Sequence, residues 1–326
     1  MRRTLLVAFS LDEAARGVAI EALGGAAELV CLADLAPPQR GAALSAATVV
    51  LVRDLKPFSA DEFALLGNVR LVQCITAGVD YLPLSQLPAN VPVAANGGGY
   101  AEPMAEHALA MVLAAVKRIV LEHAALARGE FRQHIENRML AGSVCGIFGF
   151  GSIGIATARI MRNMGLRVHG INRSGTGHPL LEWIGTPDQL DMLLAAADVM
   201  VISAPLTRST TRLFGARELA LMKSDAILVN LARGEIIDEA ALFAHLQATP
   251  TFTACIDAWW IEPIRHGAFH MDHPFMSLPN VIASPHNSAT VPGSRPAALR
   301  RAIENCKRAL VGEPVQYVVS DEHRMR

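Results

Sequence analysis

Short apolar runs alternate with amphipathic stretches along most of the chain. In the first hundred residues the β-prone runs lie at 4–10, 29–32, 49–52, 69–75 and 91–95. Two of the stretches between them begin with the spacing of a helix capping box, Ser10 with Glu13 and Ser59 with Glu62. Because strands that are separated by helices form parallel sheets, this region predicts an α/β domain.

A second alternating region extends from residue 143 to about 288. Its predicted strands lie at 144–148, 167–171, 199–203, 226–230, 252–256 and 281–284. Six strands with intervening helices are the number that a doubly wound parallel sheet needs. The sequence therefore predicts two α/β domains.

The segment that joins the two regions is rich in glycine. Asn96 and Tyr100 flank three consecutive glycines, which favour a hinge. A long helix is predicted at 101–128, with Pro103 near its start. At the other end of the chain, a helix at 296–311 places apolar residues on one face, so we expect it to pack on a core.

Composition and charge narrow the class of protein. The chain has 326 residues, of which 52% are hydrophobic and 18% charged, and a formal net charge of −1. This excludes a disordered chain and gives no basic surface for nucleic acid or anionic lipid. No apolar run approaches the roughly 20 residues that span a bilayer, and the run at 4–9 is interpreted as a strand rather than a secretory signal.

The cysteines give no sign of a metal or redox site. None of them has the C-x-x-C spacing, and most lie in apolar runs. We therefore expect small buried side chains in a protein of the reducing cytoplasm. These cysteines are Cys31, Cys74, Cys145, Cys255 and Cys306.

A G-x-G-x-x-G turn follows the strand predicted at 144–148 and opens a helical run. Gly149 allows a tight turn, Gly151 lets the backbone approach a pyrophosphate, and Gly154 lets the helix pack close to the strand. The helix N-terminus adds N–H groups and a positive dipole. The spacing predicts a dinucleotide site formed by Gly149, Phe150, Gly151, Ser152, Ile153 and Gly154.

The end of the next strand indicates which dinucleotide binds. An acid there would accept a hydrogen bond from the ribose 2′-OH and repel a 2′-phosphate, but this strand ends in Asn172, Arg173 and Ser174. A neutral amide, a guanidinium and a hydroxyl favour NADP(H). NAD(H) stays possible if Arg173 instead stacks on the adenine or points to solvent.

Three polar residues that follow predicted strands are candidates for catalysis. Reduction of a 2-oxo acid needs a cation to orient the carboxylate and polarise the carbonyl, and a group of near-neutral pKa to supply a proton. Arg233 and His286 fit these two roles, and Glu262 can hold the imidazole and favour its protonated form. Each residue taken alone is also compatible with a structural role.

The segments around these residues resemble, in order and spacing, the signature blocks of the D-isomer-specific 2-hydroxyacid dehydrogenases. The resemblance covers nearly the whole chain. Its blocks are NLARGEIIDE at 230–239, DAWWIEP at 257–263, PNVIASPH at 279–286, TAGVD at 76–80, AEH at 105–107, and PLT at 205–207 with Thr210. It implies a flavodoxin-like substrate domain at 1–99 and 289–326, with a Rossmann-type cofactor domain inserted at 100–288.

The resemblance also implies roles for individual residues. Arg233 would bind the substrate, His286 would be the acid/base and Glu262 its partner. The backbone amides of Ala77 and Gly78 would hold the substrate carboxylate. Asp257 would contact the nicotinamide side, and the further residues expected at the cofactor are Ala204, Pro205, Thr210, Ala232 and His286.

Some positions depart from the family pattern. Asn172 replaces an acid that many members keep, which places the chain near the NADP-preferring glyoxylate and hydroxypyruvate reductases. Tyr100 and the pair Trp259 and Trp260 are bulky, which makes the substrate size uncertain. Glu262 argues against the formate dehydrogenase branch, which pairs its histidine with an amide.

The function implied is the NADPH-dependent reduction of a small 2-oxo acid to the D-2-hydroxy acid. Alternatives are an NAD-dependent dehydrogenase of the phosphoglycerate type and a dinucleotide-sensing protein like the transcriptional corepressors that share this fold. The family also implies a homodimer formed through the long helix after Ala101. Although His266, His270, Asp272 and His273 are close in sequence, the reaction requires no metal, and we expect none.

Overall fold

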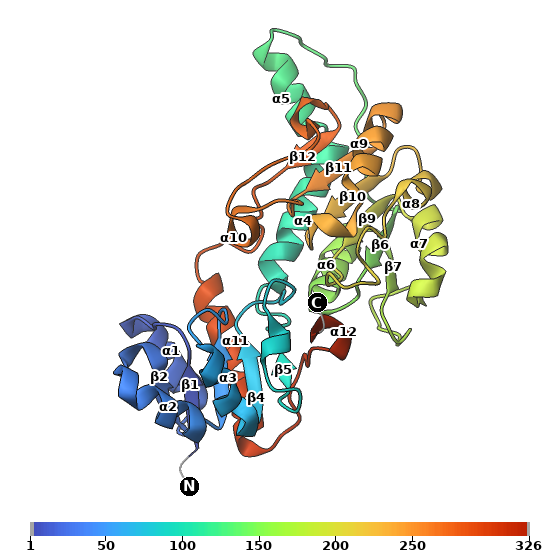
Figure 1. The fold of residues 1–326 in the computed structure, drawn as a ribbon. Helices are drawn as coiled ribbons and strands as arrows, with labels where there is room; N and C mark the ends of the chain where they lie inside the picture. The colour runs from blue at the N-terminus through green and yellow to red at the C-terminus, as the bar shows by residue number, and fades with distance from the viewer. Residues whose placement is uncertain (1–2, 325–326) are drawn as a thin grey trace. The chain divides into compact units, whose positions relative to one another are not determined.

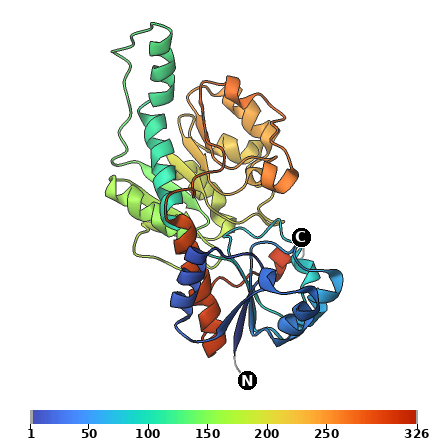
Figure 2. The same cartoon turned by 90° about the vertical axis from the view of Figure 1, so that its left-hand side faces the viewer.

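The computed structural model describes residues 3–324 (Figures 1 and 2). The chain forms two compact units. Unit 1 contains the residues up to Tyr100 and those from Val291 onward, and unit 2 is Ala101–Thr290. Each unit is built around a sheet whose strands are all parallel, so the predicted fold class is confirmed.

Unit 1 has a five-stranded sheet of order β2-β1-β3-β4-β5, which is the flavodoxin-like order. All five strands overlap the predicted runs. They are β1 Thr4–Val7, β2 Glu28–Cys31, β3 Val49–Val52, β4 Leu71–Cys74 and β5 Val93–Ala94.

Side chains of unit 1 alternate between the two faces of this sheet. Val49 and Leu51 belong to one buried cluster, and Val50 and Val52 to the other. The first cluster includes residues of α1 (Glu13–Leu23) and α11 (Ser294–Val311), and the second includes residues of α2 (Pro37–Ala46) and α3 (Ala60–Leu65). The apolar face predicted for the last helix is confirmed, because Leu299, Ile303, Cys306 and Leu310 are all buried.

The helix starts in unit 1 were predicted correctly in one of two cases. Ser59 and Glu62 form the expected capping box at the start of α3. Ser10 does not cap α1. Asp12 takes that position and accepts a hydrogen bond from the amide of Ala15 at 2.8 Å, because the helix begins two residues later than the Ser10 spacing requires.

The glycines at 97–99 are closely packed within unit 1. A Cβ at Gly97 would overlap the ring of Tyr317, and one at Gly98 would come within 2.8 Å of the Arg301 guanidinium. The buried Asn96 side chain donates to the carbonyl oxygens of Ile75, at 3.0 Å, and Ala298, at 2.8 Å. Close approach therefore explains these glycines without a hinge, and domain closure stays a prediction.

Unit 2 has a seven-stranded sheet of order β12-β11-β10-β9-β6-β7-β8. Six strands match the predicted runs and the seventh, β8, was missed because it has only three residues. The order reverses between β6 and β9, and ligands of such sheets bind beyond the carboxyl ends of the strands at this point. The strands are β6 Val144–Phe148, β7 Arg167–Ile171, β8 Trp183–Gly185, β9 Val199–Ile202, β10 Ile227–Asn230, β11 Thr253–Ile256 and β12 Val281–Ala283.

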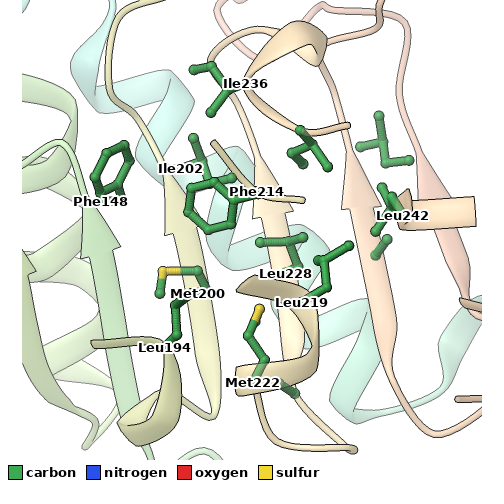
Figure 3. Close-up of a cluster of buried hydrophobic side chains, with 14 of the residues drawn as sticks. Phe148, Leu194, Met200, Ile202, Phe214, Leu219, Met222, Leu228, Ile236 and Leu242 are labelled. Carbon is green, nitrogen blue, oxygen red and sulfur yellow. The ribbon is translucent and has the colours of Figure 1, made fainter. Parts of the chain in front are cut away.

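Helices cover both faces of the unit 2 sheet. On one face, Leu194, Leu219 and Leu242 come from successive helices and pack with strand residues such as Met200 and Leu228 (Figure 3). The helices of this face are α7 Leu190–Ala196, α8 Ala216–Leu221 and α9 Glu239–Ala248. On the other face, α4 (Ala101–Val116) packs against α6 (Ser152–Asn163) through Ala105 and Ala156. A short helix of unit 2, α10, spans Pro263–His266, whereas α12 (Asp321–Arg324) belongs to unit 1.

The long helix predicted at 101–128 is two helices. Arg118 has a φ of 53°, which breaks the helix between α4 and α5 (Ile119–Ala127). In both views α5 and the segment after it extend past the end of the unit 2 sheet (Figures 1 and 2). Large apolar side chains of this arm, residues 119–139, are exposed: Ile119, Val120, Leu126, Phe131, Ile135 and Met139.

All five cysteines are free thiols with buried side chains, as predicted. Burial raises the pKa of Cys74, Cys145 and Cys255 to about 12. Among the helices of residues 3–324, none is both long enough and apolar enough to cross a bilayer.

Candidate active site

The glycine-rich turn connects β6 to α6 at the point where the strand order reverses. Gly149 has a φ of 97°, and a Cβ there would overlap the backbone of Ala204, the second residue after β9. A Cβ on Gly154 would lie 2.8 Å from the carbonyl oxygen of Gly149, so a side chain would push α6 off the strand. Both glycines therefore have the physical reasons that the sequence analysis assigned to them.

The turn leaves the N-terminus of α6 open toward a ligand. Gly151 is the N-cap residue and has no side chain to satisfy the first amides of the helix. A Cβ added at Gly151 would meet no described atom of the surrounding structure within 4 Å. Open space above uncapped amides fits the pyrophosphate of a dinucleotide.

Two neighbouring segments shape this edge of the sheet. The Phe150 side chain is buried and packs edge-on against His178, with ring centroids 5.5 Å apart, so Phe150 can offer a cofactor only its backbone. After β9, the Thr210 hydroxyl accepts from the amide of Thr207 and donates to the carbonyl of Pro205, both at 2.8 Å. This closes the segment 205–210 into a compact turn beside the glycine loop.

The residues after β7 form a polar turn. The Asn172 side-chain oxygen accepts from the amide of Ser174 at 3.1 Å, and the Asn172 amide donates to the carbonyl of Thr176 at 3.0 Å. Asn172 thus stabilises the turn that carries Arg173. The Arg173 side chain is exposed and has no ion-pair partner within residues 3–324.

Asn230 and Gly234 position the segment that carries Arg233. Asn230 is buried at the end of β10, where its side chain accepts from the amide of Ala232 at 3.1 Å and donates to the carbonyl of Arg233 at 2.8 Å. A Cβ on Gly234 would overlap the peptide bond between Trp259 and Trp260. This close approach brings the Arg233 segment against the segment that leads to Glu262.

Glu262 and His286 are in direct contact. The Nδ1 atom of His286 lies 2.8 Å from both carboxylate oxygens of Glu262. The Glu262 side chain is 9% exposed, whereas that of His286 is 33% exposed. Because Nδ1 is occupied by the carboxylate, Nε2 is the ring nitrogen available to exchange a proton with a ligand.

The environment of Glu262 favours its ionised form. Burial alone would raise the pKa of the carboxyl, but the hydrogen bond and charge of His286, the Trp259 amide and the charge of Arg233 outweigh it, so the pKa lies below its usual range. The Trp259 amide donates to Oε1 at 2.7 Å. The charge of Arg233 is one of the influences that lower this pKa, which associates Arg233 with the carboxylate that contacts His286.

Asp257 supports the turn that carries His286. Its side chain is fully buried, and its Oδ1 atom accepts from the Ser284 hydroxyl at 2.5 Å and from the Asn287 amide at 3.1 Å. The amide of His286 donates to the carbonyl of Asp257 at 2.9 Å. His286 has a φ of 49°, so this network holds it in a left-handed conformation that L-residues rarely adopt. The nicotinamide contact that the resemblance implied for Asp257 stays a prediction.

His107 extends the same network. Its Nε2 atom lies 3.0 Å from the Ser284 hydroxyl oxygen. Because the single Ser284 proton is directed at the Asp257 carboxylate, the hydroxyl oxygen accepts from His107, whose Nε2 must then carry a proton.

The two tryptophans are structural. Trp259 is buried and its indole N–H donates to the carbonyl of Ser284 at 2.9 Å. Trp260 stacks on Phe275 with ring centroids 5.3 Å apart, and its indole N–H donates to the carbonyl of Ile237 at 2.8 Å. The substrate size therefore does not follow from their bulk.

The histidines of the segment 266–273 have separate partners. His266 accepts from the amide of Glu262 at 2.9 Å, His270 pairs with Asp272 at 3.0 Å, and His273 stacks on Phe243. In the described part of the chain, no three His, Cys, Asp or Glu side chains gather closely enough to hold a metal ion.

Unit 1 contains the other residues that were predicted to bind substrate. Ala77 and Gly78 follow β4, in the segment just beyond the carboxyl end of the strand. The Tyr81 hydroxyl lies 3.2 Å from that of Thr76, and the Tyr100 hydroxyl donates to the carbonyl of Ile75 at 3.3 Å. Burial raises the pKa of Tyr100, which keeps it a neutral donor.

Sequence reasoning missed the supporting residues. His107, Ser284 and Asn230 all lie inside the motif blocks, but only the folded chain shows that they bind one another or the catalytic segments. The sequence carried one signal of this packing, which is Gly234. A glycine directly after a functional arginine indicates that another backbone segment approaches closely there.

Comparison with known proteins identifies the family. Residues 109–288 match the model of the D-isomer specific 2-hydroxyacid dehydrogenase, NAD binding domain. A glyoxylate/hydroxypyruvate reductase B from Citrobacter koseri is 32% identical over 255 residues, which cover 76% of this chain and 77% of that protein. A D-3-phosphoglycerate dehydrogenase from Methanocaldococcus jannaschii is 29% identical over 84% of this chain, but the match covers 52% of that protein, so this chain spans about half its length.

Solved structures agree with this assignment. A putative formate dehydrogenase from Pyrobaculum aerophilum has a TM-score of 0.81 at 28% identity, covering 98% of this chain and 99% of that one. A D-isomer specific 2-hydroxyacid dehydrogenase from Xanthobacter autotrophicus Py2, in complex with NADPH and MES, has a TM-score of 0.81 at 26% identity, covering 98% of each chain. With the family model matched over more than half of its length, the chain belongs to the D-isomer specific 2-hydroxyacid dehydrogenase family.

Proposed function

We propose that this protein reduces a small 2-oxo acid of the glyoxylate or hydroxypyruvate type to the D-2-hydroxy acid, with NADPH as the hydride donor. The observation that carries the proposal is the contact of His286 with both oxygens of Glu262. The charge of Arg233 acts on the same carboxylate. All three residues follow strands of a parallel sheet that also carries the dinucleotide turn.

The bound nicotinamide would supply the hydride, and the side chains would bind the substrate and supply the proton. Glu262 holds the His286 ring by Nδ1 and stabilises the imidazolium, so Nε2 can donate a proton to the oxygen that becomes the hydroxyl. Arg233 would bind the substrate carboxylate and polarise the carbonyl, because a guanidinium can donate two parallel hydrogen bonds to an anion. The amides of Ala77 and Gly78 are proposed as further donors to that carboxylate.

The cofactor would lie across the turn at 149–154. The uncapped start of α6 suits the pyrophosphate, and the segment with Ala204, Pro205 and Thr210, together with Ala232, would flank the nicotinamide half. NADPH is favoured because the exposed Arg173 guanidinium, with Ser174 beside it, is suited to a 2′-phosphate and no acid stands at Asn172. The NADPH named with the relative from Xanthobacter supports the same choice.

A phosphoglycerate-type activity is the second candidate, because D-3-phosphoglycerate dehydrogenases are among the relatives. Glyoxylate or hydroxypyruvate is preferred because the reductase from Citrobacter has the higher identity and is matched over most of its length.

We also propose a homodimer and a cytoplasmic location. The dimer is supported by the exposed apolar side chains of the arm, of which Phe131 is 78% and Met139 72% exposed. The location is supported by five free, buried cysteines, which are typical of a reducing compartment.

The experiment that tests the activity is a spectrophotometric scan. Oxidation of NADPH and of NADH would be followed at a fixed enzyme concentration with glyoxylate, hydroxypyruvate, pyruvate and 3-phosphohydroxypyruvate. The proposal expects the largest kcat/KM with NADPH and one of the first two acids. No turnover of any of the four acids would refute it, and a preference for 3-phosphohydroxypyruvate with NADH would support the second candidate.

A further inference from the structure

An ion pair that the sequence analysis did not consider lies beside the candidate catalytic residues. The Nη1 atom of Arg265 is 3.0 Å from Oε2 of Glu235, and Nη2 is 2.6 Å from Oε1. The two side chains are 14% and 25% exposed. This is a two-pronged contact that solvent screens only in part.

The positions of the two residues connect the segments that carry Arg233 and Glu262. Glu235 follows Arg233 by two residues, in a short 3₁₀ turn at Gly234–Ile236. Arg265 follows Glu262 by three residues in α10, and its amide donates to the carbonyl of Glu262 at 3.2 Å. Gly234 brings the same two segments into backbone contact, so the ion pair closes an already tight junction.

The charge of Glu235 would work against the proposed role of Arg233. A carboxylate two residues from a substrate-binding arginine attracts the guanidinium and repels an anionic ligand. Arg265 is therefore placed where it can offset the charge of Glu235.

We propose that Arg265 is a positioning residue for substrate binding, which neutralises Glu235 so that Arg233 presents its full positive charge to the carboxylate of a 2-oxo acid. This inference rests on the proposed function and adds that the site is tuned for an anion by a residue outside the family motifs quoted above. If the ion pair were only a mechanical link between the segments, replacing Arg265 or replacing Glu235 would break it equally. The two replacements would then have the same effect on substrate binding.

The test compares the two halves of the pair. Arg265→Gln leaves the Glu235 carboxylate without this neutralising partner, and we expect KM for the 2-oxo acid to rise about tenfold with kcat changed less than about threefold. Glu235→Gln removes the same contact but also the negative charge, so KM should change by less than about threefold. The double variant Glu235→Gln/Arg265→Gln should return KM toward the wild-type value, because no uncompensated carboxylate remains.

Two further variants keep the result interpretable. Arg217→Gln breaks another two-pronged contact of unit 2, in which the exposed Arg217 side chain binds Asp191 at 2.8 and 2.9 Å, and it should leave KM unchanged. Arg265→Lys keeps the charge without the fork, and it should keep KM near the wild-type value even if Arg265→Gln folds poorly. NADPH affinity and melting temperature would be measured for every variant.

The outcomes separate this inference from the function on which it rests. Absence of 2-oxo acid turnover in the wild-type protein would overturn both. Turnover in the wild type with equal KM increases in Arg265→Gln and Glu235→Gln, and no recovery in the double variant, would leave the function standing and assign the pair a mechanical role only. Unchanged KM in Arg265→Gln would overturn the inference alone.

Discussion

His286 bonds through Nδ1 to both carboxylate oxygens of Glu262, at 2.8 Å each. This symmetric contact fixes the direction of the imidazole ring and leaves Nε2 as its reactive nitrogen. The backbone also contributes, because His286 occupies a left-handed conformation that the Asp257 network holds in place. A proton donor of fixed direction is what the reduction of a carbonyl group needs.

The first prediction concerns His286 itself. His286→Asn should lower kcat by about 10²–10⁴-fold. Asparagine tolerates the left-handed backbone, but its amide cannot act as a general acid. NADPH affinity, measured by fluorescence titration, should stay within about threefold of the wild-type value. His123→Asn on the exposed surface of α5 is the matched control. Unimpaired turnover in His286→Asn would remove this residue from the mechanism.

The second prediction concerns the dependence of stability on pH. The folded pKa of Glu262 lies below the ordinary glutamate value of 4.5, so the folded state favours the carboxylate. The stabilisation is fully present above about pH 4.5 and is lost as the pH falls through the lower folded pKa. The difference in unfolding free energy between wild type and Glu262→Gln should therefore shrink between pH 5.5 and pH 3.

Urea denaturation at each pH measures this difference. Glu106→Gln on the exposed surface of α4 serves as the control and should give a nearly constant difference from wild type. If the Glu262→Gln difference were equally constant, the carboxylate would not be stabilised by its surroundings.

Much of the fold follows from local pattern. Buried parallel strands such as Val49–Val52 and Val144–Phe148 are continuous apolar runs, which the sequence makes plain. The strand β8 was missed because three residues carry too little pattern, and the break at Arg118 was missed because both sides of it are good helix formers. The start of α1 was misassigned because Ser10 and Asp12 are both good caps, and only the fold selects between them.

Local pattern also predicted part of the candidate site. Arg233, Glu262 and His286 stand out because each follows a strand and lies in a motif, and the structure brings Glu262 and His286 into contact within reach of Arg233. The burial of Asp257 and its link to Ser284 depend on contacts between residues 27 positions apart. No local pattern encodes such a pairing, and the Glu235–Arg265 contact was missed for the same reason.

The third prediction concerns the choice of dinucleotide. Arg173→Ala should raise KM for NADPH relative to that for NADH by about ten- to a hundredfold, because a charge-assisted hydrogen bond to the 2′-phosphate would be lost. Arg167→Ala is the control, since Arg167 begins the same strand at its opposite end and is also exposed. Equal effects on both cofactors would show that Arg173 does not read the 2′ position.

The fourth prediction uses the close approach at Gly234. A methyl group there would overlap the Trp259–Trp260 peptide bond, so Gly234→Ala should destabilise the protein by about 1–3 kcal/mol and lower kcat/KM by displacing Arg233. Gly17→Ala in α1 is the matched control. Its methyl group meets no described atom within 4 Å, and alanine should stabilise that helix by about 0.5–1 kcal/mol. Wild-type stability and activity in Gly234→Ala would show that the junction can relax.

The last prediction concerns the arm at 119–139. If its apolar side chains are covered by a second copy of the chain, Phe131→Asp combined with Ile135→Asp should convert a dimer to a monomer, because two charges would be buried without partners. Sedimentation velocity over a range of concentrations measures the change in mass. Met276→Asp, at a residue 60% exposed outside the arm, should leave the mass unchanged. A wild-type protein that sediments as a monomer at all concentrations would contradict the proposed dimer, and a double variant that stays dimeric would place the interface elsewhere.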